Sequence, residues 1–270
     1  MLSNTYDMLG LLRDNIGEKI TAQWEDYQLL RKLNASYRSV LRSVSKSMGQ
    51  WLVVSTSITA VNSVLTLPSD CAKPIYLEDE DGYPVNWLNS VAQRSLDRGQ
   101  ISEVYSLRNT LEINTSGNNK TFTLWYQLRA PELHAGQCFA GGTGTITLEG
   151  DKYSRVQDDY YNNYEIDIIS GSYPGRYTIT DFVGSTRVAS LNSTDTFDLE
   201  LYGIVPVIPE ECINLVVLEA TYYALLKPSS IVDDKLKDHY FNLLKMEKKS
   251  VDDWLAERVI ENTGVSIREY

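Results

Sequence analysis

The chain has 270 residues, of which 43% are hydrophobic and 23% charged, and its formal net charge is −11. These proportions are ordinary for a soluble globular protein of one or two domains, and no apolar run reaches the roughly 18–20 residues of a membrane-spanning helix. The acidic balance argues against a nucleic-acid-binding protein, which usually carries a basic surface.

Apolar residues at helical spacing predict two helices near the N-terminus. A short pattern around Tyr6, Leu9 and Leu12 predicts the first. The second is expected to start at Thr21, because the acidic residues that follow complement the positive end of a helix dipole. Its apolar stripe, at spacings of three and four, comprises Leu30, Leu33, Tyr37, Val40 and Val44.

Basic residues occupy a neighbouring face of the second helix. Arg31, Arg38 and Arg42, followed by Lys46, are spaced so that they lie close together on the helix surface. Two interpretations remain open for them. They contact an acidic neighbouring subunit, or they form a basic face exposed to solvent.

Residues 50–128 change to short alternating runs separated by turn formers, which predict a small antiparallel sheet. A short helix is expected around residues 89–98. The predicted strands lie around residues 52–54, 63–67, 75–77, 107–113 and 121–128.

A glycine cluster at residues 141–144 precedes a second run of predicted strands. No GK[ST] follows it, so we interpret it as a flexible junction rather than a phosphate-binding loop. Between Asp158 and Leu191, polar turn residues separate runs with period two, such as residues 165–168 and 176–180. This pattern predicts an inserted β module.

The helical pattern returns at Pro209, which is followed by two glutamates as expected at a helix N-terminus. A last helix is expected from Ser230, and it ends near Gly264. The residues beyond it alternate apolar and polar, a pattern that can add a strand to a partner. The last helix carries an apolar stripe of Leu236, Tyr240, Leu243, Val251, Trp254 and Leu255.

Together these elements predict an α+β fold with a helical bundle core made by the N- and C-terminal helices, a small antiparallel sheet and an inserted all-β module. The expected domains are 1–140 for the helical region and sheet, 141–200 for the β module, and 201–270 for the C-terminal helices and tail. Net charge is expected to differ between them: about −1, −6 and −4 by counting charged residues.

Residue types needed for catalysis are sparse. Two histidines, His134 and His239, exclude a multi-histidine metal site, and three cysteines form no CxxC pair. Cys212 lies on a helical pattern and is expected to be a small buried hydrophobic residue. We therefore predict no enzyme activity, metal or cofactor. One alternative is a cell-wall hydrolase using two of the paired carboxylates, such as those at 158–159 or 252–253.

Two segments carry a resemblance to a known family. Residues 24–34 (WEDYQLLRKLN) and 67–78 (LPSDCAKPIYLE), with the C-terminal helix pair and tail, resemble the head-to-tail adaptor (connector) proteins of tailed bacteriophages, especially short-tailed ones. Residues 158–189 are similar to a small β insertion of phage virion proteins. The insertion, some 60 residues long, distinguishes this chain from the smallest adaptors, which are little more than a helical bundle.

The resemblance implies a structural virion protein at the head–tail interface, made in the host cytoplasm. Its copies would form a ring, expected to be a dodecamer, beneath the portal protein. The ring would extend the DNA channel without binding DNA specifically and would contact tail components such as a nozzle or tail fibre. The expected subunit contacts are Arg31, Arg38 and Arg42, and the expected portal-docking residues are Trp254, Val259, Ile260, Val265, Ile267, Arg268 and Tyr270.

A second function from another class also fits the sequence. The β insertion is rich in tyrosines, and aromatic rings on a surface stack on sugars. A phage tail module that recognises a host-surface carbohydrate is therefore the alternative. The tyrosines concerned are Tyr153, Tyr160, Tyr161, Tyr164 and Tyr173.

Overall fold

The computed structural model describes residues 4–17, 24–49, 51–87, 103–107, 110–113, 119–150, 155–226 and 234–263, with the side chains of 103–107 and 259–263 left out. The chain divides into two compact units: residues 1–49 with 130–270, and residues 50–129. This division differs from the expected one at 1–140, 141–200 and 201–270. The helices and the β module belong to one unit, and the N-terminal sheet forms the other.

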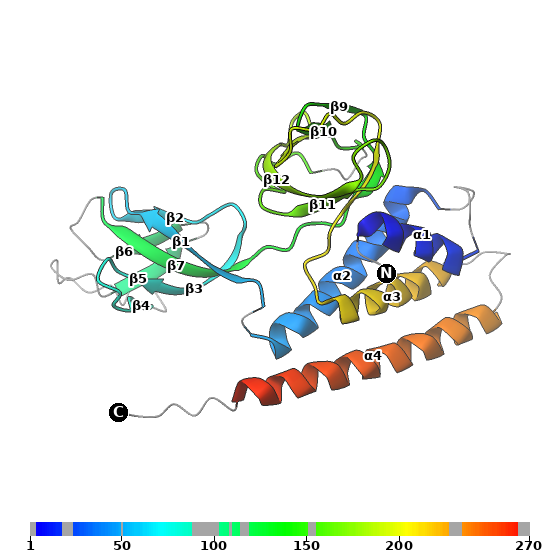
Figure 1. Ribbon diagram of the computed structural model, residues 1–270. Helices are drawn as coiled ribbons and strands as arrows, with labels where there is room; N and C mark the ends of the chain where they lie inside the picture. Colours follow the sequence, from blue (N-terminus) through cyan, green and yellow to red (C-terminus); the bar gives the residue numbers. More distant parts are fainter. Residues whose placement is uncertain are drawn as a thin grey trace. The chain divides into compact units, whose positions relative to one another are not determined.

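The unit of residues 50–129 consists of two small sheets that share one apolar core (Figure 1). One sheet has the order β1 (Val53–Thr59), β7 (Thr121–Leu128) and β3 (Cys71–Glu78). The other has the order β2 (Val64–Thr66), β6 (Thr110–Ile113), β5 (Glu103–Leu107) and β4 (Asn86–Trp87). Pro74 lies in β3, an edge strand with irregular register, where the missing N–H of proline is tolerated.

The turn between β2 and β3 contains Asp70, which is part of the LPSD segment. The Asp70 carboxylate accepts a hydrogen bond from the Tyr126 hydroxyl at 3.1 Å, and its carbonyl accepts one from the Arg129 N–H at 2.6 Å. Asp70 therefore ties the start of β3 to the end of β7.

Four α-helices are described in the other unit (Figure 1): α1 (Thr5–Asn15), α2 (Asp26–Ser47), α3 (Ile213–Leu225) and α4 (Asp234–Thr263). Helix α3 contacts each of the other three. The predicted apolar stripe of α2 is confirmed, since all five of its residues are at most 6% exposed. Helix α2 begins at Asp26, and the expected start at Thr21 lies outside the described residues.

The β module is a curled seven-stranded antiparallel sheet. Strand β12 pairs with β11 through its first half and with β13 through its second half, and the register shifts between Ile179 and Asp181. Such a bulge bends a strand and increases its twist, so it allows the sheet to curl around a core. The order is β8 (Ala135–Gln137), β14 (Leu201–Ile204), β11 (Glu165–Ile168), β12 (Gly175–Val183), β13 (Val188–Leu191), β10 (Thr145–Thr147) and β9 (Ala140–Gly142).

The two ends of this order are neighbours in the sequence. Strands β8 and β9 are separated only by Cys138 and Phe139, whose N–H groups bond to the carbonyls of Glu200 and Thr147. One continuous segment, residues 135–142, therefore pairs with both ends of the sheet and closes it. The enclosed core includes Ile166, Ile179, Phe182, Phe197, Tyr202 and Ile204.

The glycine cluster is part of this sheet, so its interpretation as a flexible junction is wrong. Gly141 and Gly142 lie in β9, and Gly144 adopts a φ of 64° in the turn to β10. A Cβ on Gly141 would lie 2.0 Å from the carbonyl oxygen of Phe197. These glycines permit a tight turn and a close approach of two backbone segments. From the sequence alone, glycines with these roles look the same as glycines in a flexible linker.

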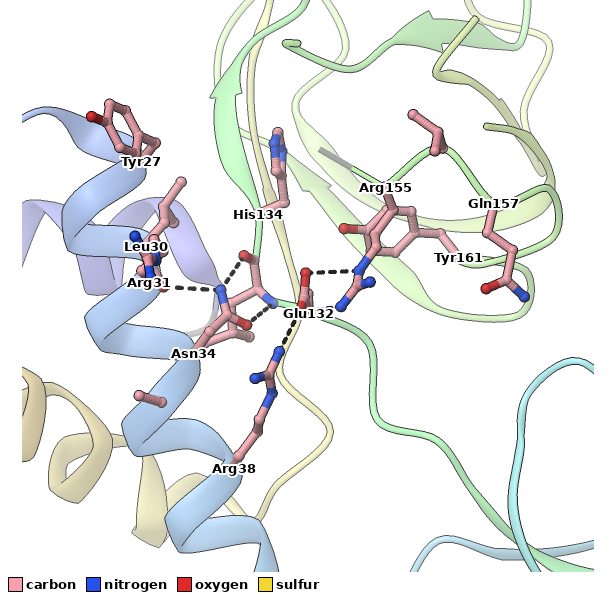
Figure 2. Close-up of a pocket in the computed structure, with 13 residues that line it drawn as sticks. Tyr27, Leu30, Arg31, Asn34, Arg38, Glu132, His134, Arg155, Gln157 and Tyr161 are labelled. Atoms are coloured by element: carbon pink, nitrogen blue, oxygen red, sulfur yellow. Dashed lines mark hydrogen bonds and ion pairs between the residues drawn. The ribbon is translucent and has the colours of Figure 1, made fainter. Parts of the chain in front are cut away.

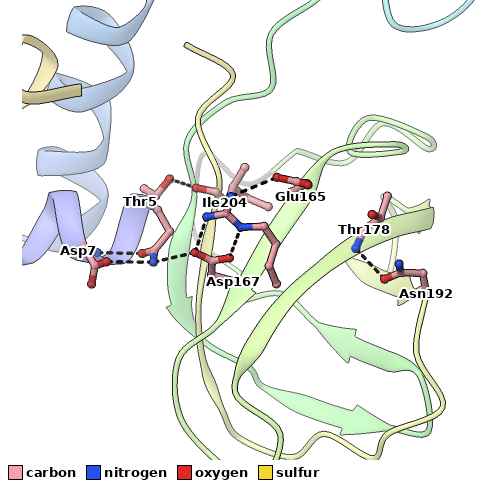
Figure 3. A network of polar contacts seen from close by, with 9 residues as sticks. Thr5, Asp7, Glu165, Asp167, Thr178, Asn192 and Ile204 are labelled. Carbon is pink, nitrogen blue, oxygen red and sulfur yellow. Dashed lines mark hydrogen bonds and ion pairs between the residues drawn. The ribbon is translucent and has the colours of Figure 1, made fainter. Parts of the chain in front are cut away.

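Polar contacts attach α1 to the curled sheet (Figure 3). The Thr5 hydroxyl donates to the carbonyl of Ile204 at 2.5 Å, and the Asn4 amide donates to Asp167 at 3.1 Å. Asp167 in turn accepts two hydrogen bonds from Arg176, at 2.8 and 3.1 Å. The helices and the β module are thus connected through β11 and β14.

The predicted helical bundle core is wrong. The protein is mixed α+β, with four described helices and a large curled seven-stranded sheet that encloses an apolar core of its own. The stripe on α2 correctly indicated a buried face. It carried no information on how much of the chain would fold as sheet.

Candidate functional site

A pocket lies between α2 and the β module (Figure 2). It has a volume of about 590 Å³, which is within the usual range of ligand-binding pockets. One wall is the exposed flank of α2, and the others come from the segments before β8 and before β11. The lining residues that matter most are Tyr27, Arg31, Arg38, Glu132, His134 and Arg155.

Asn34 fixes the position of α2 against the segment before β8. Its side-chain NH₂ donates to the carbonyls of Leu30 and Leu133, both at 2.9 Å, and its side-chain oxygen accepts from the Leu133 N–H at 2.8 Å. A pair of reciprocal bonds to one backbone residue specifies both distance and orientation. Asn34 therefore holds the floor of the pocket in place.

Glu132 is shared by two arginines on opposite sides of the pocket (Figure 2). It forms an ion pair with Arg38 of α2 and accepts two hydrogen bonds from Arg155, one of them at 2.9 Å. The bond to Glu132 raises the pKa of Arg155, which also lies over the Tyr160 ring at 5.0 Å. The Glu132 side chain is 20% exposed, and those of Arg38 and Arg155 are 52% and 43% exposed.

His134 forms the wall toward the sheet core. The hydroxyl of buried Tyr202 accepts the Glu149 N–H at 2.8 Å and lies 2.8 Å from His134 Nδ1. The Tyr202 hydroxyl and His134 Nδ1 thus form a second hydrogen bond, whose direction is set by the tautomer of the imidazole. Burial raises the pKa of Tyr202 well above its ordinary value, so the hydroxyl keeps its proton.

The pocket is electropositive in an acidic chain. Its lining includes three arginines, whereas Glu132 is the single acidic residue among the described lining residues. The formal charge of the lining is thus about +2 with His134 neutral. An arrangement of guanidinium groups around a concave surface can bind an anionic group, and the fork of each guanidinium matches a carboxylate or a phosphate.

The residues predicted at subunit contacts are all exposed on α2, but only two of them belong to the pocket. Arg31 and Arg38 line it, and Arg42 lies outside it. Arg38 is paired with Glu132 within the chain. Sequence reasoning missed Glu132, Asn34 and Arg155, although Asn34 ends the segment that carries the family resemblance.

The predicted portal-docking residues belong to the end of α4 and to the residues after it. Trp254 is half-buried, and Arg258 lies over its ring at 5.1 Å. Val259 and Ile260 are in α4, but their side chains lie outside the described residues. So do Val265, Ile267, Arg268 and Tyr270.

Of the five tyrosines expected to bind sugars, two are buried and one is exposed. Tyr161 and Tyr164 are 2% and 5% exposed, Tyr160 is half-buried, and Tyr153 lies outside the described residues. Tyr173 is exposed. The predicted burial of Cys212 is confirmed, and Cys71 and Cys138 are also buried.

The described part of the chain contains neither a candidate metal site nor a candidate membrane-spanning helix. No group of three or more histidine, cysteine or acidic residues there is arranged to hold a metal ion. No helix in that part combines the length and apolar character needed to cross a membrane.

The sequence matches no protein-family model, and no curated protein is significantly similar to it. The function therefore has to be argued from the residues of this chain and their arrangement.

Proposed function

We propose that the chain is a structural, non-enzymatic virion protein of a tailed bacteriophage that connects the portal to the tail. Copies of the chain form a ring, expected to have twelve members, on the portal protein. The ring extends the channel through which DNA passes, and its other side contacts a tail component.

The exposure of α4 is the observation that best supports this proposal. The helix has 30 residues, so it is about 45 Å long, yet Val251 and Leu255 are the only buried side chains among its described residues 234–258. Met246 is 70% exposed, and Phe241 is 37% exposed. A long helix that buries so little within its own chain gains most of its stabilisation from a partner, as an assembly protein requires.

The segments that carry the family resemblance occupy positions that organise the fold. Residues 24–34 include the N-cap Glu25 and the first turns of α2, and they end at Asn34, which binds Leu133. Residues 67–78 contain the Asp70 turn and β3. Resemblance at such positions is consistent with a shared framework rather than with a shared catalytic site.

Electron microscopy of the purified protein mixed with its cognate portal ring tests the proposal. We expect a collar of added density on the portal that the protein alone does not form. Absence of added density, at concentrations where circular dichroism shows a folded protein, would contradict the proposal.

A truncation tests the predicted docking residues separately. Removing residues 264–270 leaves α4 intact to Thr263, so we expect a folded protein that no longer adds density to the portal. The variant Ser185→Ala, which changes an exposed turn residue elsewhere, serves as the control and is expected to bind the portal. Normal portal binding by the truncated protein would refute the predicted docking role of Val265, Ile267, Arg268 and Tyr270, which the truncation removes, while leaving the ring proposal standing.

A further inference from the structure

The pocket beside α2 is an electropositive site in a protein that is otherwise acidic. The chain carries a net charge of −11, and residues 141–200, which supply Arg155, hold 10 acidic and 4 basic residues by count. Three arginines nevertheless converge on one cavity of about 590 Å³. Concave sites lined by one sign of charge concentrate ions of the other sign, so this cavity attracts an anionic group.

The contacts of Glu132 show how the arginines of this pocket hold a carboxylate. Its carboxylate lies between Arg38 and Arg155 and accepts hydrogen bonds from both. Arg38 uses one guanidinium nitrogen for this contact, and a guanidinium has five N–H donors. Both arginine side chains are about half exposed, and together with Glu132 they carry a net charge of +1.

The pocket also has apolar lining residues, which can contact the methylene groups of a bound side chain. Tyr27, Leu30 and Val156 line the cavity beside the arginines. A glutamate or aspartate side chain places methylene groups against such surfaces and its carboxylate against the guanidinium groups. The volume accommodates a few residues of a peptide.

We propose that this pocket binds an acidic peptide segment of a partner protein, whose carboxylates pair with Arg31 and Arg38 beside the Glu132 bridge. A peptide fits the charge distribution better than a nucleic acid. A polyanionic strand extending beyond the pocket meets an acidic chain, whereas a short peptide presents its carboxylates only at the pocket. The proposal does not depend on the identity of the assembly in which the protein acts.

The test is a binding titration of the full chain with a blocked, fluorescently labelled peptide of sequence Glu-Asp-Glu-Asp, followed by fluorescence anisotropy. The matched probe is Gln-Asn-Gln-Asn, which has the same shape without charge. We expect binding of the acidic peptide that weakens as salt is added, and at least about tenfold weaker binding of the amide peptide.

Three variants locate the binding. Arg31→Gln leaves the Glu132 bridge intact and is expected to weaken peptide binding about tenfold, as is Arg38→Gln. Arg42→Gln removes an exposed arginine of the same helix that does not line the pocket, and it should leave binding unchanged. Thermal unfolding of each variant confirms that the comparison is made between folded proteins.

The proposal is overturned if neither peptide binds, if both bind equally, or if Arg42→Gln weakens binding as much as Arg31→Gln. Competition with inorganic phosphate and with a short oligothymidine tests the other anions. An oligonucleotide that binds more tightly than the peptide, and loses binding in Arg31→Gln, would assign the pocket to nucleic acid instead. Failure of the portal experiment described above would leave this result unaffected.

Discussion

At the scale of single residues, the buried hydroxyl of Tyr202 belongs to a chain of hydrogen bonds. Tyr202 is fully buried, and its hydroxyl accepts one hydrogen bond from the Glu149 N–H and shares a second with His134 Nδ1. The hydroxyl thereby links the sheet core to the pocket wall. A buried hydroxyl with both partners is worth much more than its exposed counterpart, because its removal leaves two polar groups unsatisfied.

Tyr202→Phe is expected to destabilise the protein by about 1–3 kcal/mol, since the Glu149 N–H and His134 Nδ1 lose their common partner. Urea unfolding followed by tryptophan fluorescence measures the change. Tyr173→Phe, at a residue that is 46% exposed, is the matched control and should change stability by less than about 0.5 kcal/mol. Equal effects of the two substitutions would mean that the buried hydroxyl contributes nothing specific.

At the scale of elements, the contact between α1 and β14 depends on a glycine. A Cβ on Gly203 would lie 2.6 Å from the backbone nitrogen of Tyr6 and 2.9 Å from the Asn4 side-chain oxygen. Helix α1 therefore approaches the sheet as closely as the absence of a side chain allows. Gly10, on the exposed side of the same helix, has no atom within 4 Å of such a Cβ.

The two glycines predict opposite effects of alanine. Gly203→Ala is expected to destabilise by about 1–3 kcal/mol, because α1 must shift away from β14. Gly10→Ala is expected to stabilise by about 0.5–1 kcal/mol through helix propensity. Thermal unfolding of both variants checks the pair, and a stabilised Gly203→Ala protein would show that α1 is not held against the sheet.

Elements with local signals were predictable from the sequence, and elements that depend on distant pairing were not. The stripe of α2 and the strand at residues 121–128 have the expected residues, because periodicity reports which face is buried. The run at 107–113, expected as one strand, contributes to two strands, β5 and β6. The ion pair between Arg38 and Glu132 joins residues 94 apart, and no local pattern contains it.

At the scale of the whole molecule, the net charge of −11 governs encounters with other polyanions. We expect no retention of duplex DNA by the protein in a gel mobility assay at physiological ionic strength, because like charges repel. A basic DNA-binding protein in the same gel is the control. Salt-sensitive binding of DNA would contradict this expectation and would weaken the proposal that DNA passes the protein without being held.

The closure of the β module by residues 135–142 has a consequence for how the protein is made. The pairing of Gln137 with Leu201 spans more than 60 residues, so the ribosome must synthesise the chain past β14 before the seam can form. Pairings of such long range slow folding, and until then the nascent sheet exposes open edges. Once residues 135–142 pair with both ends of the sheet, no open edge is left there. Other copies of the chain then cannot add a strand at these edges and aggregate.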